Sequence, residues 1–280
     1  MKIIILTILL ALSSISAEQD FAEFINHHVT NTEQWSIGSL SLDLSKFQLV
    51  YKGIHFGPTL DVMMLFIAGL LAFFSLKAAA KRKNDQPTSK WGQAIEVVID
   101  FLKQDFILPF MGEKEAKKWT PFLLSVFFFL LFLNLLSLIP YMGAPTGNIN
   151  FTAAMAIMVF LVFNIAGMKA NGPFNYVKGL VPAGTPAPIL VILFPIEVLG
   201  LLTKTVALAI RLFANLAAGH FVIFSLLGLI VLFKKLALAP AFVGFALAIY
   251  LLEILVSFLQ AYVFTLLTTL FISGAVQQDH

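Results

Sequence analysis

Long runs of apolar residues, separated by short polar stretches, dominate this sequence. Apolar runs with few or no charges occupy about residues 61–76, 119–140, 151–168, 189–233 and 237–274. A helix needs about 20 apolar residues to cross the hydrocarbon core of a bilayer, so these five runs predict five membrane helices. We therefore expect an all-α polytopic membrane protein, with a membrane domain that covers residues 61–280.

The last two apolar runs are too long to stand upright in a membrane. As one helix, residues 189–233 would measure roughly 65 Å, whereas the hydrocarbon core is about 30 Å thick. Residues 237–274 are also overlong. We expect these two helices to form a hairpin that is strongly tilted and lies partly along the membrane plane.

Positive charge beside the first span predicts how the chain is oriented. Five basic residues follow the run at 61–76 closely: Lys77, Lys81, Arg82, Lys83 and Lys90. Clusters of Lys and Arg near a span mark its cytoplasmic end. We therefore expect the N-terminus to lie outside and the C-terminus, after five spans, to lie in the cytoplasm.

Two segments between the spans have patterns of their own. Residues 91–110 place apolar side chains on one side and charged side chains elsewhere, which predicts a helix lying on the cytoplasmic membrane surface. Residues 170–188 are dense in glycine and proline. This composition predicts an irregular cytoplasmic connector.

The N-terminal residues have the pattern of an export signal. Residues 1–17 combine one lysine, a short apolar run and small residues before an acidic stretch, as in a secretory signal peptide. The alternative is an uncleaved anchor, although the run is shorter than the ~20 residues of a span. Residues 18–60 are then an exported N-terminal segment, in which we assign the adjacent His27 and His28 no role.

The composition excludes several classes of protein. Of the 280 residues, 59% are hydrophobic and 12% are charged, and the mean hydropathy of +0.92 rules out a water-soluble globular domain. The chain has no cysteine and matches no nucleotide-binding, zinc or serine-hydrolase motif. We expect no enzyme activity of the chain by itself, no cofactor, no metal site, no direct nucleotide binding and no nucleic-acid partner.

Charges within the fourth apolar run need an explanation, because a central Arg in a membrane helix costs at least ~2.5 kcal/mol. At about 100° per residue, four polar residues fall on one stripe of this helix: Glu197, Lys204, Arg211 and Asn215. Glu197 and Lys204 either pair near the cytoplasmic interface or take part in the entry or exit of an ion.

Arg211 is the deepest of these charges. An ion pair within the chain is one explanation, but Glu197 lies about 21 Å away along a straight helix, and Glu253 belongs to the following helix. Small residues on the same face allow a second helix to approach closely: Ala207, Ala214 and Ala218. We favour a contact with another chain over packing within this one.

The last apolar run carries a polar strip that suits a water-filled path. Four residues lie within about 60° of one another on this helix: Tyr250, Glu253, Ser257 and Gln260. His220 points about 180° away from Arg211, so it must face another element, and Glu253 is the obvious candidate. Such a pair can pass protons near neutral pH, and a purely structural pair is equally consistent with the sequence.

Three segments resemble subunit a of the F-type ATP synthases. Leu201 to His220, LLTKTVALAIRLFANLAAGH, closely resembles the signature of that family. Leu252 to Leu266, LEILVSFLQAYVFTL, resembles its final helix, and Asn134 to Pro140, NLLSLIP, with the following PTGNINFT, resembles its second span and outer loop. The likeness covers about residues 50–275, and it departs from the family in the exported extension and in Ser137, where some members have an acid.

The resemblance implies a role for Arg211. It is the family's essential arginine, which faces the carboxylate carried by each subunit of the rotating c-ring. A guanidinium stays charged at any accessible pH, so it favours the deprotonated form of that carboxylate and bars protons from leaking between entry and exit paths. By the same resemblance, Asn215 and Gln260 are polar companions of the arginine.

The resemblance also assigns the remaining polar residues. Glu197 matches an acidic position associated with the cytoplasmic path. His220 and Glu253 match a pair that lines the outer half-channel, and some bacterial members resemble this chain with the acid and the histidine exchanged between the two positions.

The function that the resemblance implies is that of the proton-channel stator subunit of a bacterial F-type ATP synthase in the inner membrane. Its partners would be the c-ring, the subunit b stator, other ATP synthase subunits and membrane lipid. One alternative is a secondary transporter with Arg211 as its anion-binding residue, but the inverted repeats that it predicts are not seen. Another is a membrane assembly or insertion factor without an ion path.

Overall fold

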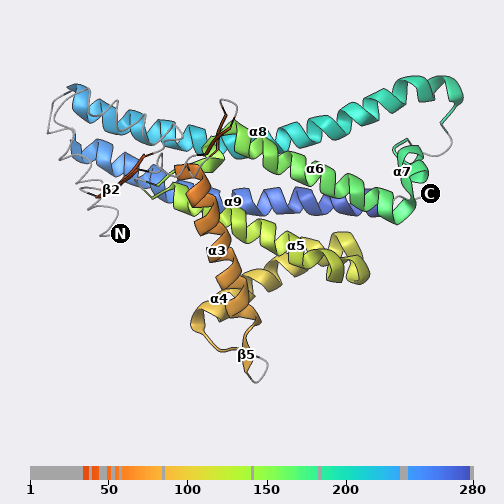
Figure 1. Cartoon of the computed structure of the whole chain (residues 1–280), viewed down its shortest axis with the longest axis horizontal. Helices are drawn as coiled ribbons and strands as arrows, with labels where there is room; N and C mark the ends of the chain where they lie inside the picture. The colour runs from red at the N-terminus through yellow and green to blue at the C-terminus, as the bar shows by residue number, and fades with distance from the viewer. Residues whose placement is uncertain are drawn as a thin grey trace. The chain divides into compact units, whose positions relative to one another are not determined.

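The computed structural model describes residues 34–37, 40–43, 49–51, 54–56, 59–83, 86–139, 142–181, 185–233 and 239–277 (Figure 1). The predicted signal peptide at 1–17, and His27 and His28, lie outside these residues. The prediction that residues 18–60 are exported stays a prediction.

Helices make up nearly all of the described membrane domain. The α-helices are α3 (Leu60–Ala80), α4 (Lys90–Leu102), α5 (Leu108–Ser137), α6 (Ile149–Asn171), α7 (Pro173–Lys178), α8 (Ala187–Phe233) and α9 (Ala239–Val276). A π-helical turn, η2 (Lys103–Ile107), joins α4 to α5, and a 3-10 turn, η3 (Pro145–Gly147), precedes α6. In the described part of the chain, five helical stretches are long and apolar enough to cross a membrane. The predicted all-α polytopic fold is confirmed.

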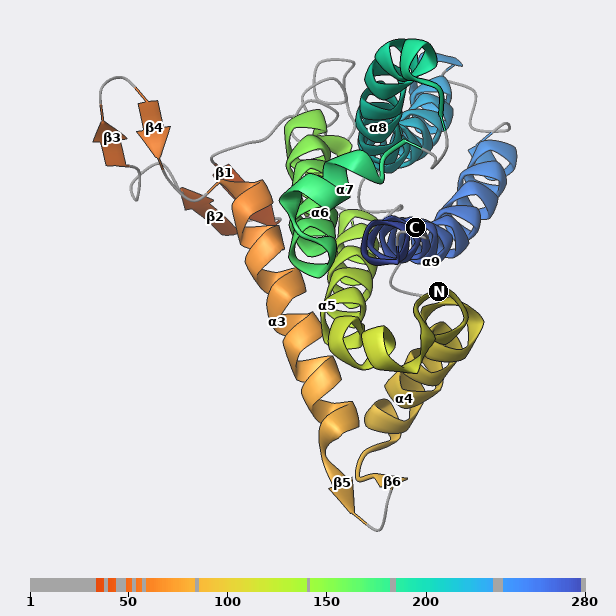
Figure 2. The same ribbon diagram turned by 90° about the vertical axis from the view of Figure 1, so that its right-hand side faces the viewer.

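The strands are short and form three separate antiparallel hairpins. β1 (Gln34–Ile37) pairs with β2 (Leu40–Asp43), β3 (Leu49–Tyr51) pairs with β4 (Ile54–Phe56), and β5 (Arg82–Lys83) pairs with β6 (Gln86–Pro87). The register sets Gln34 opposite Asp43, Leu49 opposite Phe56 and Arg82 opposite Pro87. Figure 2 shows the last hairpin directly after α3, between that helix and α4. None of these hairpins was predicted from the sequence.

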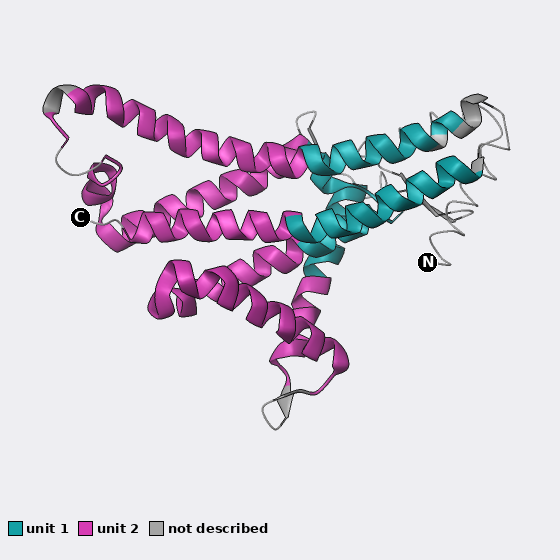
Figure 3. Ribbon diagram, turned by 180° about the vertical axis from the view of Figure 1, so that it is seen from behind, with its two compact units in different colours: residues 1–70, 131–148, 214–259 teal, residues 71–130, 149–213, 260–280 magenta. Residues whose placement is uncertain are grey.

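The chain divides into two compact units (Figure 3). Unit 1 comprises residues 1–70, 131–148 and 214–259, and unit 2 comprises residues 71–130, 149–213 and 260–280. Each unit is therefore built from segments that are far apart in the sequence.

Unit 1 is held together by an apolar core and by two long-range hydrogen bonds. Its buried apolar side chains come from α3, α5, α8 and α9: Leu60, Met64, Ala68, Leu133, Leu136, Leu216 and Ala246. The Tyr250 hydroxyl donates to the backbone carbonyl of Leu138 at 2.9 Å. The Asn134 amide donates to the carbonyl of Ser257 at 3.5 Å. These bonds join the end of α5 to the polar strip of α9.

Unit 2 has an aromatic core. Its fully buried rings are Phe106, Phe127, Phe128 and Phe264. The Phe163 ring on α6 contacts that of Phe271 on α9, with 5.7 Å between ring centroids. Three buried threonines of α9 bond to carbonyls four residues earlier in their own helix, at 2.8 to 2.9 Å: Thr265, Thr268 and Thr269.

The helix predicted at 91–110 is present as three consecutive elements, α4, η2 and the first turn of α5. Gly112 then interrupts α5 with φ 68° and ψ 166°. The break frees backbone carbonyls, and α9 supplies their donors. The Ser273 hydroxyl donates to Phe110 O at 2.5 Å, and the Gln277 amide donates to Met111 O at 2.7 Å. Beyond Gly112 the charged residues remain helical, so α5 begins well before the predicted start at 119.

The prediction of an irregular connector at 170–188 is wrong for α7. Gly172, at φ 80°, turns the chain out of α6, and Pro173 then occupies the first turn of the new helix. Tyr176 anchors this helix, because its hydroxyl donates to the Asn164 side chain at 2.9 Å. Burial also raises the pKa of the Tyr176 phenol, which keeps it a donor.

The last two helices are as overlong as predicted. α8 has 47 residues and α9 has 38. At about 1.5 Å per residue they measure roughly 70 Å and 57 Å, about twice the thickness of a bilayer core. Neither helix can stand upright in a membrane.

Candidate functional site

The six predicted site residues lie on α8 and α9 and are shared between the units. Unit 2 holds Glu197, Arg211 and Gln260, whereas unit 1 holds Asn215, His220 and Glu253. We describe the two groups in turn.

Arg211 lies exposed on α8 in unit 2. Among the residues that the structure describes, no carboxylate forms an ion pair with its guanidinium. Ala207, one turn earlier on the same face, is also exposed. The charge that was predicted to lack a partner within its own chain therefore points away from the rest of unit 2.

Most of the exposed side chains around Arg211 are apolar, although Lys204 on the same stripe is also exposed. Val206 is 54% exposed and Ile210 is 52% exposed. Exposed large side chains continue toward the start of the helix: Ile189, Leu190, Val191, Ile192, Phe194, Ile196, Leu199 and Leu202. Exposed apolar side chains over this length of helix suit lipid or another apolar protein surface rather than water.

The other unit 2 residues differ in exposure. Glu197 is half-exposed near the start of α8. Gln260 on α9 is buried, with a side chain that is only 6% exposed. One turn of α9 is fixed close to Gln260, because the Tyr262 hydroxyl hydrogen-bonds to the Asp105 carboxylate of η2.

Glu253 is the most unusual residue of unit 1. Its side chain is only 7% exposed, and neither carboxylate oxygen has a hydrogen-bond partner among the described residues. The carboxylate lies against Gly219 of α8, where a side chain would overlap it. A buried carboxylate without a donor is costly, so this position requires water or a proton.

His220 follows Gly219 in α8 and is partly buried. Its ring makes a hydrogen bond with the backbone of Ser137 at the end of α5. It also stacks edge to face with Phe224, with ring centroids 5.8 Å apart. The predicted neighbour, Glu253, lies on the facing helix, but the structure does not join the two side chains by a hydrogen bond.

Further buried polar atoms in unit 1 lack protein partners among the described residues. They are Asn134 Oδ1 on α5 and Thr146 Oγ1 in η3. Asn215 on α8 is half-buried. Buried polar atoms without protein partners are commonly satisfied by ordered water. Ordered water would satisfy these atoms within the otherwise apolar core of unit 1.

The decisive comparison is with protein families of known function. The sequence pattern of the ATP synthase A chain matches residues 62–273. The chain belongs to this family. Its resemblance to subunit a of the ATP synthases is thereby confirmed.

Relatives in the ATP synthase A chain family cover most of this chain. ATP synthase subunit a of Chloroherpeton thalassium is 42% identical over 261 residues, which are 91% of this chain and 77% of that protein. That of Myxococcus xanthus is 42% identical over 225 residues, 79% of this chain and 74% of its own. That of an Anaeromyxobacter species is 41% identical over 231 residues, 81% of this chain and only 56% of its own. The chain thus spans little more than half of the last relative.

One polar residue of this family member was missed by the sequence reasoning. Asp61, in the first turn of α3, is half-buried in unit 1 and accepts a hydrogen bond from the Asn148 side chain. A Cβ atom at Gly143 would lie 2.9 Å from its Oδ1. The available signal was an acidic residue at the very start of the predicted first span at 61–76, to which we gave no role.

Proposed function

We propose that this chain is the proton-conducting stator subunit in the membrane sector of a bacterial rotary ATP synthase. The observation that carries the proposal is Arg211, an exposed guanidinium on a largely apolar helix without an ion pair among the described residues. A charge at membrane depth needs a counter-charge. In this proposal the carboxylates of a rotating c-ring supply it, one after another.

The chemistry of Arg211 follows from its fixed charge. A guanidinium keeps its proton at any accessible pH, so it lowers the pKa of an approaching carboxylic acid and releases that proton to the exit path. It also repels a proton that would pass directly between the two paths. The ring carboxylate then moves on, takes a proton from the entry path and returns through lipid in its neutral form.

The polar interior of unit 1 supports an outer half-channel. Glu253, His220 and Asp61 supply groups that exchange protons, and they lie among buried polar atoms that need water. The Glu253 carboxylate accepts and returns a proton, and His220 takes part near neutral pH. A chain of water molecules between these groups would carry protons from outside toward the ring.

The remaining residues fit the second half-channel and the contact with the ring. Glu197, half-exposed at the start of α8, is proposed to line the cytoplasmic path. Asn215 and Gln260 are proposed to hold polar groups near the arginine. The exposed apolar face of α8 would contact the c-ring, and subunit b and other subunits would complete the complex in the inner membrane, with the N-terminus outside and the C-terminus cytoplasmic.

ATP-driven acidification of inverted membrane vesicles tests the role of Arg211. The variants Arg211→Ala and Lys178→Ala are expressed within the whole complex, and assembly is measured by co-purification of the ring. We expect Arg211→Ala to assemble but to abolish acidification, whereas Lys178→Ala on α7 should acidify normally. Coupled pumping by assembled Arg211→Ala would overturn the proposal, and the use of sodium-free buffer shows whether the ion is a proton.

A further inference from the structure

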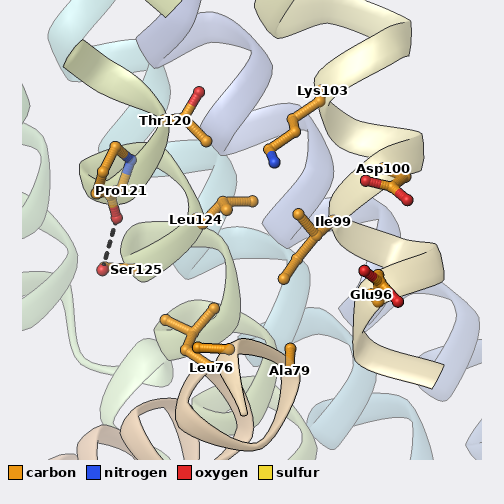
Figure 4. A pocket seen from close by; sticks show the side chains of 11 residues that line it. Leu76, Ala79, Glu96, Ile99, Asp100, Lys103, Thr120, Pro121, Leu124 and Ser125 are labelled. Carbon is orange, nitrogen blue, oxygen red and sulfur yellow. Dashed lines mark hydrogen bonds between the residues drawn. The ribbon is translucent and has the colours of Figure 1, made fainter. Parts of the chain in front are cut away.

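A pocket of about 330 Å³ lies between α3, α4 and α5 in unit 2 (Figure 4). Each of the three helices contributes an apolar side chain to its lining: Leu76, Ile99 and Leu124. The wall formed by α4 and the start of η2 also carries three charged residues: Glu96, Asp100 and Lys103. The pocket therefore combines apolar side chains with charges of both signs, and none of its residues belongs to the proposed proton path.

The position of the pocket along its helices is that of the lipid headgroups. On α3 it lies at the last turns, just before the basic cluster begins. On α5 it lies at Thr120, where the charged stretch gives way to the apolar run. Trp91 of α4 is 56% exposed and donates to Ser75 on α3 at 3.2 Å, as expected for an interfacial tryptophan. Both spans therefore enter the hydrocarbon at the level of the pocket.

Asp100 and Lys103 in the pocket do not neutralise one another. Asp100 and Lys103 are three residues apart on one helix, a spacing at which ion pairs form. Yet in the described part of the chain neither makes an ion pair. Figure 4 shows the Lys103 ammonium turned toward Thr120 and Leu124, whereas Asp100 lies on the α4 wall. One positive and one negative group are thus available to the same ligand.

We propose that this pocket binds a zwitterionic phospholipid with an ethanolamine headgroup. The Lys103 ammonium binds the lipid phosphate, and the Asp100 carboxylate accepts hydrogen bonds from the lipid ammonium. An acyl chain runs along Leu76 and Leu124. This proposal rests on the pocket alone and is independent of the proposed proton path.

The charges select this headgroup over the other common ones. The three charged residues sum to one negative charge, so an anionic glycerol headgroup meets two carboxylates and offers them no cation. A choline headgroup carries a cation but has no N–H to donate. Only an ethanolamine headgroup offers both a phosphate to the Lys103 ammonium and N–H groups to the Asp100 carboxylate.

Photo-crosslinking in vesicles tests the proposal with the whole complex. Vesicles contain equal parts of phosphatidylethanolamine, phosphatidylcholine and phosphatidylglycerol, and one lipid at a time carries a photoreactive acyl chain. We expect the ethanolamine lipid to label the peptides that contain Leu76 and Leu124 about tenfold more than the other two, the effect of one charge-assisted hydrogen bond. Asp100→Asn and Lys103→Gln should each remove most of this preference, whereas Glu113→Gln, outside the pocket, should retain it.

Several outcomes overturn the proposal. Equal labelling by the three lipids means that only annular lipid is present. Preferential labelling by phosphatidylglycerol means that Lys103 alone recruits an anionic lipid. Absence of lipid labelling in the assembled complex means that a protein partner covers the pocket. A preference that survives both pocket variants means that these charges do not select the headgroup.

Discussion

Gly219 on α8 lies directly against the carboxylate of Glu253 on α9, so that a methyl group at position 219 would overlap it. The two helices approach closely here only because one of them lacks a side chain. The contact fixes where the carboxylate sits in unit 1.

Substitution of Gly219 should therefore displace Glu253. In the complete complex we expect Gly219→Ala to reduce ATP-driven proton pumping by at least ~tenfold, because groups that hand on protons must stay within hydrogen-bond reach. Gly200→Ala, on the same helix but with open space around it, should pump normally. Equal pumping by the two variants would show that the position of Glu253 does not matter.

His220 and Glu253 should act as a pair although no hydrogen bond joins them. They lie at the same contact between α8 and α9, so water can connect them. Exchanging the two residues should retain much more pumping than replacing either one by alanine, because both protonatable groups remain at the contact. The measurement is vesicle acidification by the exchange variant and the two single variants. Equal losses of acidification in all three variants would show that His220 and Glu253 do not act as a pair.

Asp61 should matter for proton flow although it is far from Arg211 in the sequence. Asp61→Asn keeps the size of the side chain but removes the proton-binding group. We expect a several-fold slower rate of acidification with normal assembly, within the range of lost acid–base function. Glu113→Gln, an exposed acid outside unit 1, is the matched control. An unchanged rate in Asp61→Asn would confine its role to the hydrogen bond with Asn148.

Gly112 should be important for stability rather than for pumping. Its φ of 68° and ψ of 166° strain any residue with a Cβ atom, at a cost of about 1–3 kcal/mol. Gly112→Ala should lower the thermal unfolding temperature of the purified complex. Gly274→Ala, at an open position in the middle of a regular helical turn of α9, should leave it unchanged or raise it slightly. An unchanged unfolding temperature for Gly112→Ala would mean that the break is not needed.

The five membrane helices could be predicted from sequence because each is a continuous run of apolar residues along the chain. A long apolar run needs no knowledge of its neighbours to be assigned to a membrane. The exposure of Arg211 agrees with the expectation that its partner lies outside the chain. The overlong α8 and α9 follow from counting residues.

The features that were missed depend on contacts between distant segments. The break at Gly112 is stabilised by Ser273 and Gln277, more than 160 positions later in the chain. α7 is stabilised by the hydrogen bond between Tyr176 and Asn164. The glycine and proline residues around it led to the prediction of an irregular connector instead of a helix. The partner of Asp61 likewise lies across an intervening span. Local composition carries no information about such pairings.

The three threonines that bond to their own helix have a consequence for the far end of α9. A hydroxyl that donates its hydrogen to a carbonyl of the same helix cannot readily pass a proton on to a neighbouring group. Thr265, Thr268 and Thr269 all donate in this way, and all three are fully buried. In the proposed proton path, this stretch would therefore insulate despite its polar composition. Proton leakage along α9 past Gln260 would be prevented by side chains that are polar but already hydrogen-bonded within their own helix.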